Sequence, residues 1–195
     1  MPGIVVHASR SVYWPVPKNA CSAIKARICE LEGIDPGTNV HMALFEKCGV
    51  KDYPEYRAFA VSRNPYSRIY SLWRDKIIEN DKYNGTPDPN VFSHYGDLFK
   101  FGIPFNEFIH LIVSIPYEKA DPHFALQTKQ IPHRCGVVRF EHMQPLMLGL
   151  FHNSNVTKNH DYKQACAQDD LCDLIYQHYK EDFIRFNYSG DLTVD

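Results

Sequence analysis

The first part of the chain changes from a strand-like apolar run to helical periodicity across a short turn. The run at residues 11–16 (SVYWPV) is followed by a turn at residues 17–22. Beyond this turn, apolar residues recur at helical spacing, at Ile24, Ile28 and Leu31. Gly33 then ends the pattern, as glycine commonly does after a helix. The segment predicts strand, turn and helix, although Pro15 is unfavourable inside a central strand.

A second stretch repeats this order. The strand-like run Tyr56–Ser62 leads into Arg63, and Pro65 suits the first turn of a helix, where its missing N–H has no cost. An apolar stripe at helical spacing follows, formed by Tyr66, Ile69, Tyr70, Trp73 and Ile77. Two strand–turn–helix units predict an α/β fold with a central parallel sheet. Ligands of such sheets bind beyond the carboxyl ends of the strands.

Further elements follow from the same patterns. We expect a short helix at residues 40–48, a polar loop at 79–90, irregular chain at 116–135 and a strand at 136–140. An amphipathic helix is predicted to begin at Pro104 and to bury Phe105, Phe108, Ile109 and Ile112. A long final helix is predicted to begin at Asp169 and Asp170 and to bury Leu171, Ile175, Tyr179 and Phe183. No repeat or linker divides the sequence. Residues 1–195 are therefore predicted to form one domain.

The charge and composition of the chain limit the classes of binding partner that we expect. The formal net charge is −2, which gives no global reason to expect nucleic acid or an anionic membrane as partner. The sequence has no apolar stretch long enough to span a bilayer and no secretory leader at its start, which predicts a cytoplasmic protein. The six cysteines are widely spread, with no CxxC or HExxH pattern, so we expect mostly reduced thiols and no metal.

The turn at residues 17–22 has the features of an anion site. It lies before a helix N-terminus, where backbone N–H groups and the helix dipole favour negative charge. Lys18 adds a mobile cation and Ser22 a hydroxyl donor. Considered by itself, the turn is explained equally well as an anion site or as a structural connector between the strand and the helix. The turn lacks the GxxxxGK[ST] pattern of nucleotide triphosphate P-loops.

The second turn adds a matching set of donors. Arg63 stands where the strand meets its helix, and Ser67 and Ser71 share a face of that helix. A phosphate over this face would accept from the arginine fork and a serine hydroxyl together. Considered separately, Arg63 is explained as a residue in a surface salt bridge. Ser71 is then explained as a small residue at a contact between helices.

Together these segments resemble the sulfotransferases that use 3′-phosphoadenosine 5′-phosphosulfate (PAPS), particularly the membrane-type carbohydrate sulfotransferases of the chondroitin and HNK-1 kind. The segment VPKNACSAIK at residues 16–25 is similar to the 5′-phosphosulfate loop of that family. The segment FAVSRNPYSRIYSLWRDK at residues 59–76 is similar to its 3′-phosphate motif. Weaker similarities follow at residues 105–108 (FNEF), 121–124 (DPHF), 139–143 (RFEHM) and 179–188 (YKEDFIRFNY). The sequence departs from the family pattern at Ser62, Asn64 and Phe124, and we expect no counterpart of the family's membrane anchor in it.

The resemblance implies a P-loop-like three-layer fold and an enzyme that moves the sulfuryl group of PAPS to a hydroxyl, releasing adenosine 3′,5′-bisphosphate (PAP). It implies donor contacts from Lys18, Arg63 and Ser71, and from a loop formed by Asn19, Ala20, Cys21, Ser22 and Ala23. Lys18 would stabilise charge on the leaving oxygen. His123, in the DPHF segment, and His41, between the two donor motifs, are the two candidates for the general base.

The acceptor is expected to bind to loops of the chain. We expect a carbohydrate or a small hydroxyl compound, bound by the loops at residues 79–100 and 116–134, where Tyr83, His94, Tyr95 and Tyr117 are positioned to stack on a sugar. Because the chain is short for the family, we expect a pocket that is open or that a second subunit completes. Relatives of the chondroitin kind work in the Golgi lumen, which is the expected compartment if this chain is a fragment of an anchored protein.

Two other functions fit parts of the sequence. One is a P-loop-type kinase, which the missing GK[ST] pattern disfavours. The other is a non-catalytic module that binds PAP or an anionic glycan. Lys18 and the two candidate bases favour the enzyme over this module.

Overall fold

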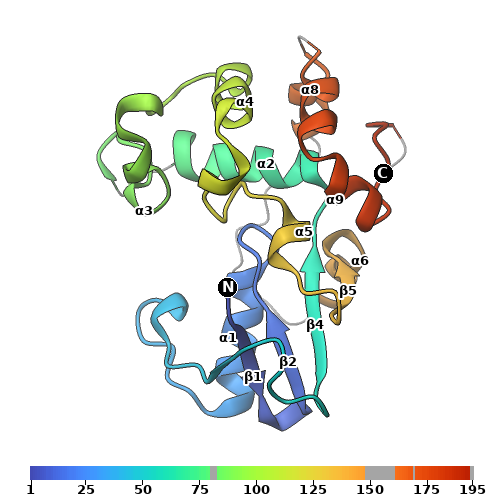
Figure 1. The fold of residues 1–195 in the computed structure, drawn as a ribbon. Helices are drawn as coiled ribbons and strands as arrows, with labels where there is room; N and C mark the ends of the chain where they lie inside the picture. Colours follow the sequence, from blue (N-terminus) through green and yellow to red (C-terminus); the bar gives the residue numbers. More distant parts are fainter. Residues whose placement is uncertain (80–82, 148–160, 169, 194–195) are drawn as a thin grey trace. The chain divides into compact units, whose positions relative to one another are not determined.

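The computed structural model describes residues 1–79, 83–147, 161–168 and 170–193. The chain divides into two compact units. The first consists of Met1–Arg63 and Gln127–Asn155, and the second of Asn64–Leu126 and Val156–Asp195 (Figure 1).

The first unit contains a five-stranded sheet with the order β3-β1-β2-β4-β5 (Figure 1). The strands are β1 (Gly3–Val6), β2 (Ser11–Trp14), β3 (Lys47–Cys48), β4 (Arg57–Ser62) and β5 (Gly136–Arg139). Strand β4 pairs in parallel with β2 on one side and β5 on the other, whereas β1 pairs antiparallel with β2 and β3. The sheet confirms the predicted α/β class and the parallel pairing of the two strands that lead into the candidate turns.

Helices flank this sheet. The first unit contains α1 (Cys21–Glu32), α5 (Gln127–Gln130), α6 (Phe140–Met147) and two 3₁₀ turns, η1 (His7–Ser9) and η2 (Val40–Met42). Ile24, Ile28 and Cys29 of α1 pack with side chains of β1, β2 and β4 in one apolar core. Leu31, predicted to join this core, is 44% exposed. The apolar face of α1 thus extends one turn beyond the surface it packs against, and Gly33 ends the helix with φ 65°.

Two predictions from the sequence were wrong, and each concerns a segment that lies wholly or partly in the first unit. Only residues 40–42 of the expected helix at residues 40–48 are helical, and Lys47–Cys48 form β3 instead. Pairing of β3 with Gly3 and Ile4 outweighs the weak local helical pattern. The segment 116–135, expected to be irregular, contains α5 and, in the second unit, the 3₁₀ turn η6 (Tyr117–Lys119).

The second unit is helical. Its elements are α2 (Pro65–Trp73), the π-helical turn η3 (Arg74–Ile78), α3 (Pro89–Phe92), η5 (Ser93–Leu98), α4 (Phe105–Ser114), η6, α7 (Asp161–Cys166), α8 (Leu171–His178) and α9 (Lys180–Arg185) (Figure 1). Helix α2 begins at Pro65 as predicted, and the Asn64 side chain accepts from the Tyr66 N–H at 2.9 Å. The predicted loop at residues 79–90 ends earlier than expected, because Asp88 caps α3.

The apolar stripes of this unit are confirmed. All four predicted residues of α4 are buried, and of the α2 stripe only Trp73 is half-buried. The long final helix is two helices, because the backbone of Tyr179 leaves the helical region between α8 and α9. The Tyr179 hydroxyl donates to the Phe124 carbonyl at 2.8 Å, and Leu171, Ile175, Tyr179 and Phe183 are all buried. Asp169, expected at the start, lies outside the described residues.

Within the described ranges, none of the helices combines the length and the apolar content that a bilayer-spanning segment requires.

Candidate functional site: the turns after β2 and β4

The turn between β2 and α1 has an unusual backbone. Lys18 and Ala20 have positive φ angles of 69° and 59°, although neither is glycine. For residues with a side chain, this left-handed conformation costs roughly 1–2 kcal/mol each. Such residues persist only where the surroundings hold them. Asn19, between them, has no positive φ, and this alternation is the geometry in which successive N–H groups form an anion-binding concavity.

The start of α1 adds further donors to this turn. Helix α1 begins at Cys21, and the first N–H groups of a helix have no partner within the helix. Ala20, at the N-cap, has no side chain able to accept from them. The N–H groups at the start of α1, including those of Ser22 and Ala23, therefore present a partial positive charge suited to phosphate or sulfate oxygens.

Asn19 ties the turn to the sheet. Its side chain is fully buried, and its Nδ2 donates to the Val61 carbonyl at 2.7 Å and to Gln127 Oε1 at 2.6 Å. The Gln127 amide also pairs with the backbone of Arg63, accepting from its N–H at 2.9 Å and donating to its carbonyl at 2.9 Å. These bonds join the end of β4 to the middle of the strained turn.

Arg63 makes a second contact with the same turn. Its guanidinium donates to the Lys18 carbonyl at 3.0 Å and lies over the Phe140 ring, 4.7 Å from the ring centroid. The residue is only 6% exposed. The structure thus brings together Lys18 and Arg63, which the sequence assigned to opposite ends of one ligand. A guanidinium has five N–H donors, so the bond to Lys18 is compatible with holding an anion as well.

His41 lies beside the start of α1. Its Nε2 lies 2.8 Å from Ser22 Oγ, and its Nδ1 lies 3.1 Å from Lys25 Nζ. A lysine ammonium only donates, so Nδ1 accepts and Nε2 carries the hydrogen that is donated to Ser22. Burial lowers the pKa of Lys25, and the nearby charge of Lys47 adds to this lowering. The chain Lys25–His41–Ser22 orients the serine hydroxyl at the helix N-terminus.

Ser71 and His123 belong to the second unit. Ser71 and its neighbour Ser67 are both buried on α2, and the Ser67 hydroxyl donates to the Asn64 carbonyl at 3.2 Å. His123 has a clear partner: its Nδ1 lies 2.7 Å from Asp121 Oδ1. A carboxylate at Nδ1 fixes the tautomer in which Nε2 is the acceptor. This arrangement suits His123 for accepting a proton.

The segment that carries His123 is held by a buried arginine. Arg68 on α2 is 2% exposed, and its guanidinium donates to the carbonyls of Ala125 and Pro122, both at 2.9 Å. Two charge-assisted bonds to backbone acceptors are strong contacts. Arg68 therefore fixes the backbone on both sides of His123.

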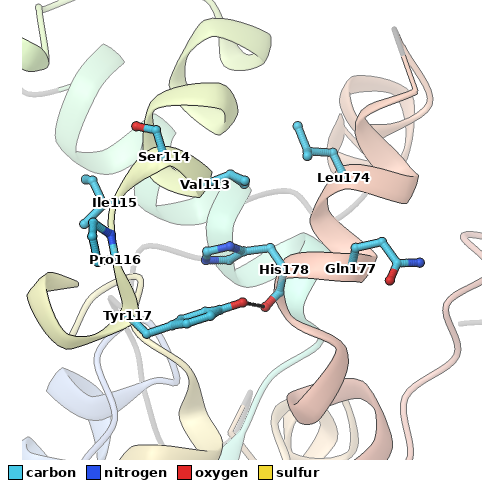
Figure 2. Close-up of a pocket in the computed structure, with 8 residues that line it drawn as sticks. All are labelled: Val113, Ser114, Ile115, Pro116, Tyr117, Leu174, Gln177 and His178. Atoms are coloured by element: carbon cyan, nitrogen blue, oxygen red, sulfur yellow. Dashed lines mark hydrogen bonds between the residues drawn. The ribbon is translucent and has the colours of Figure 1, made fainter.

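A surface pocket also lies in the second unit, between the C-terminal parts of α4 and α8 (Figure 2). Its volume is about 360 Å³, and it is lined by Val113, Ser114, Ile115, Pro116, Tyr117, Leu174, Gln177 and His178. The Tyr117 ring stacks on His178 with centroids 4.9 Å apart, and its hydroxyl donates to the His178 carbonyl at 3.0 Å. Burial lowers the pKa of His178, so its ring favours the neutral form.

The aromatic residues that we expected to stack on a sugar differ in their surroundings. Tyr117 lines this pocket and is 50% exposed. Tyr95 has a packing role, because its hydroxyl donates to the Lys119 carbonyl at 2.6 Å and accepts from the Asp121 N–H at 2.8 Å. The Tyr83 hydroxyl accepts from Asn90 Nδ2 at 2.9 Å, and His94 is exposed.

Among the residues that the structure describes, no three His, Cys, Asp or Glu side chains form a group suited to a metal ion.

The fold and the site define a class of protein: an α/β protein in which two adjacent parallel strands end in a left-handed turn and at a buried arginine. The family model described as "Sulfotransferase family" matches residues 4–145, which is more than half of the chain. The chain therefore belongs to the sulfotransferase family, whose members transfer sulfuryl groups. Comparison with curated proteins and comparison with solved structures each gave no match.

Several residues of this site were not found by sequence reasoning. Gln127 lies in a segment expected to be irregular, and a glutamine there carries no recognisable signal. Lys25 and Arg68 are ordinary cations on helices, and only the folded chain shows their partners. The spacing of Asp121 and His123 is a signal that could have been used, because side chains two residues apart in a turn can pair.

We predict that Arg68→Met lowers the free energy of unfolding by about 2–4 kcal/mol, because it removes a buried guanidinium and leaves the carbonyls of Pro122 and Ala125 without their charged donor. Urea denaturation followed by circular dichroism measures this change. Arg27→Met is the matched control: its side chain is 43% exposed and paired with Glu30, so we expect a change within about 0.5 kcal/mol. Equal effects of the two substitutions would contradict the anchoring role of Arg68.

Proposed function

We propose that this chain is a PAPS-dependent sulfotransferase that moves the sulfuryl group to a hydroxyl acceptor, with a carbohydrate as the favoured acceptor class. The observation that carries the proposal is the contact between the two candidate donor motifs, in which the Arg63 guanidinium donates to the Lys18 carbonyl at 3.0 Å. Family membership supports sulfuryl transfer, and the motif resemblance supports PAPS as the donor.

In this proposal the turn after β2 binds the 5′ side of the donor. Backbone N–H groups of residues 20–23 and the Ser22 hydroxyl hold phosphosulfate oxygens, whereas the Asn19 N–H, expected in this set, donates to the Val16 carbonyl at 3.2 Å. Arg63 and Ser71 bind the 3′-phosphate that separates PAPS from ordinary adenine nucleotides. Arginine suits this role because its planar fork matches phosphate oxygens.

The reaction is an in-line transfer. The acceptor oxygen forms a bond to sulfur while the bond between sulfur and the 5′-phosphate oxygen breaks, and PAP leaves. Charge moves onto that phosphate oxygen, and in this proposal the Lys18 ammonium neutralises it. Positioning and electrostatic stabilisation supply most of the rate enhancement in such transfers.

The two candidate histidines take different roles in this proposal. His123 is the general base, because Asp121 holds its Nδ1–H and Nε2 accepts the proton of the acceptor hydroxyl. His41 is a positioning residue, because Lys25 occupies its Nδ1 while Nε2–H donates to Ser22. In this state His41 has no lone pair for the acceptor proton.

A direct test offers PAPS carrying labelled sulfur and a panel of glycans and small alcohols to the purified protein, with products identified by mass spectrometry. We expect a sulfated product without added metal, and binding of PAP that exceeds binding of ATP with Mg²⁺ in calorimetry. Tight ATP binding with no PAP binding would favour a kinase. PAP binding without any turnover would favour a non-catalytic module.

We expect Lys18→Ala and Arg63→Ala to affect different steps. Loss of the Lys18 ammonium should lower kcat by about 10²–10³-fold, because the leaving oxygen loses its partner. Loss of the Arg63 guanidinium should raise the Kd of PAP by roughly 10- to 150-fold, as expected for a charged hydrogen bond of about 1.5–3 kcal/mol. Steady-state kinetics and calorimetry measure the two. Lys51→Ala, at an exposed lysine outside the proposed donor and acceptor segments, serves as the control.

The different roles proposed for the two histidines predict different kinetic effects when each is replaced by alanine. His123→Ala should lower kcat by about 10²–10⁴-fold, the usual range for removal of a general base. His41→Ala should mainly raise the KM for the donor, because Ser22 loses its orienting partner. His110→Ala, at an exposed position on α4, is the control. A large loss of kcat in His41→Ala with no loss in His123→Ala would reverse the assignment.

A further inference from the structure

Gln127 occupies a position that none of the donor motifs includes. It is the first residue of α5 and is fully buried. Its amide forms a matched pair of hydrogen bonds with the N–H and the carbonyl of Arg63, directly after the last residue of β4. The side chain therefore continues the hydrogen bonding of the sheet by one residue beyond the strand.

This pair fixes which way the Gln127 amide points. The Arg63 N–H requires the oxygen on its side, and the Arg63 carbonyl requires the NH₂ group on the other. The fixed Oε1 in turn orients Asn19, whose NH₂ group faces two acceptors, Gln127 Oε1 and the Val61 carbonyl. Asn19 Oδ1 is turned away, and it is buried without a hydrogen-bond partner among the described residues.

The residues that Gln127 holds are the ones on which the strained turn depends. Asn19 lies between Lys18 and Ala20, the two left-handed residues of the turn. The Arg63 side chain reaches the same turn at the Lys18 carbonyl. One buried amide thus contacts both attachments of the turn to the sheet, through the Asn19 side chain and through the Arg63 backbone.

We propose that Gln127 is a positioning residue for the sulfuryl donor: it keeps the turn at residues 17–20 and the Arg63 guanidinium in the register that binds the nucleotide. This role rests on the proposed PAPS site. Without the Gln127 amide, the Arg63 backbone and the Asn19 side chain lose a shared, buried hydrogen-bond partner. The left-handed turn then loses contacts that hold its backbone in the strained conformation.

The test compares Gln127→Leu with the parent. Leucine is similar in size and apolar, so the substitution removes three hydrogen bonds with little change in volume. We expect the Kd of PAP, measured by calorimetry on protein shown to be folded by circular dichroism, to rise at least tenfold. The donor KM should rise in parallel, while the acceptor KM stays within twofold. Gln164→Leu, at an exposed position on α7, makes the same chemical change and should leave all three values unaltered.

A second variant keeps the test decisive if Gln127→Leu does not fold. Gln127→Asn keeps a neutral amide but withdraws it by one methylene from the Arg63 backbone and from Asn19, so the Kd of PAP should rise in the same direction without a change of charge. The double variant Asn19→Ala with Gln127→Leu should weaken PAP binding by less than the product of the single effects, because both act through one contact.

The outcomes separate the two proposals. If the parent binds PAP and the Gln127 variants bind it equally well, or lose acceptor and donor affinity alike, Gln127 has only a structural role and the PAPS site stands. If the parent binds no PAP, the proposed function fails, and the positioning role of Gln127 fails with it.

Discussion

The constraint on which the site depends is a left-handed turn built without glycine. Lys18 and Ala20 both hold positive φ angles, which the local sequence does not favour. The turn persists because its central side chain, Asn19, is buried and bonded at both hydrogens of its NH₂ group. The backbone N–H groups that would receive an anion are thereby fixed before any ligand arrives, which reduces the cost of ordering on binding.

The same network explains why a strand end and a helix start can work as one site. Strand β4 ends at Ser62, and the next residue, Arg63, is held by its backbone to Gln127 and by its side chain to the Lys18 carbonyl. The parallel pairing of β2 with β4 places the two strand ends on the same edge of the sheet. Parallel sheets bind ligands at this edge because the turns that follow the strands meet there.

The two histidines show how hydrogen-bond partners give identical side chains different donor and acceptor atoms. His41 and His123 are equivalent candidates as residue types. In the folded chain one ring lies between a cation and a serine hydroxyl, and the other is bonded to a carboxylate. A cationic donor at Nδ1 takes up the lone pair of one ring, whereas a carboxylate at Nδ1 leaves the Nε2 lone pair of the other to accept a proton. The chemistry of each ring is thus set by its neighbours.

Local patterns in the sequence determined much of the fold. The strand–turn–helix order, the start of α2 at Pro65 and the buried faces of α2, α4, α8 and α9 all follow from periodicity and from proline and glycine signals, which act within a few residues. The two-residue strand β3 and helix α5 could not be predicted in this way. They depend on pairing with distant segments, as β3 does with β1.

The same division holds for the site. Lys18, Ser22 and Arg63 were recognisable because motif spacing is a local property. Gln127, Lys25 and Arg68 became visible only in the folded chain. Hydrogen bonds between residues more than sixty positions apart, such as those from Gln127 to Arg63, leave no periodic trace in the sequence. Sequence alone thus pointed to the groups that we propose carry the chemistry, and tertiary structure decided which of them are held in place, because directional bonds require the final positions of both partners.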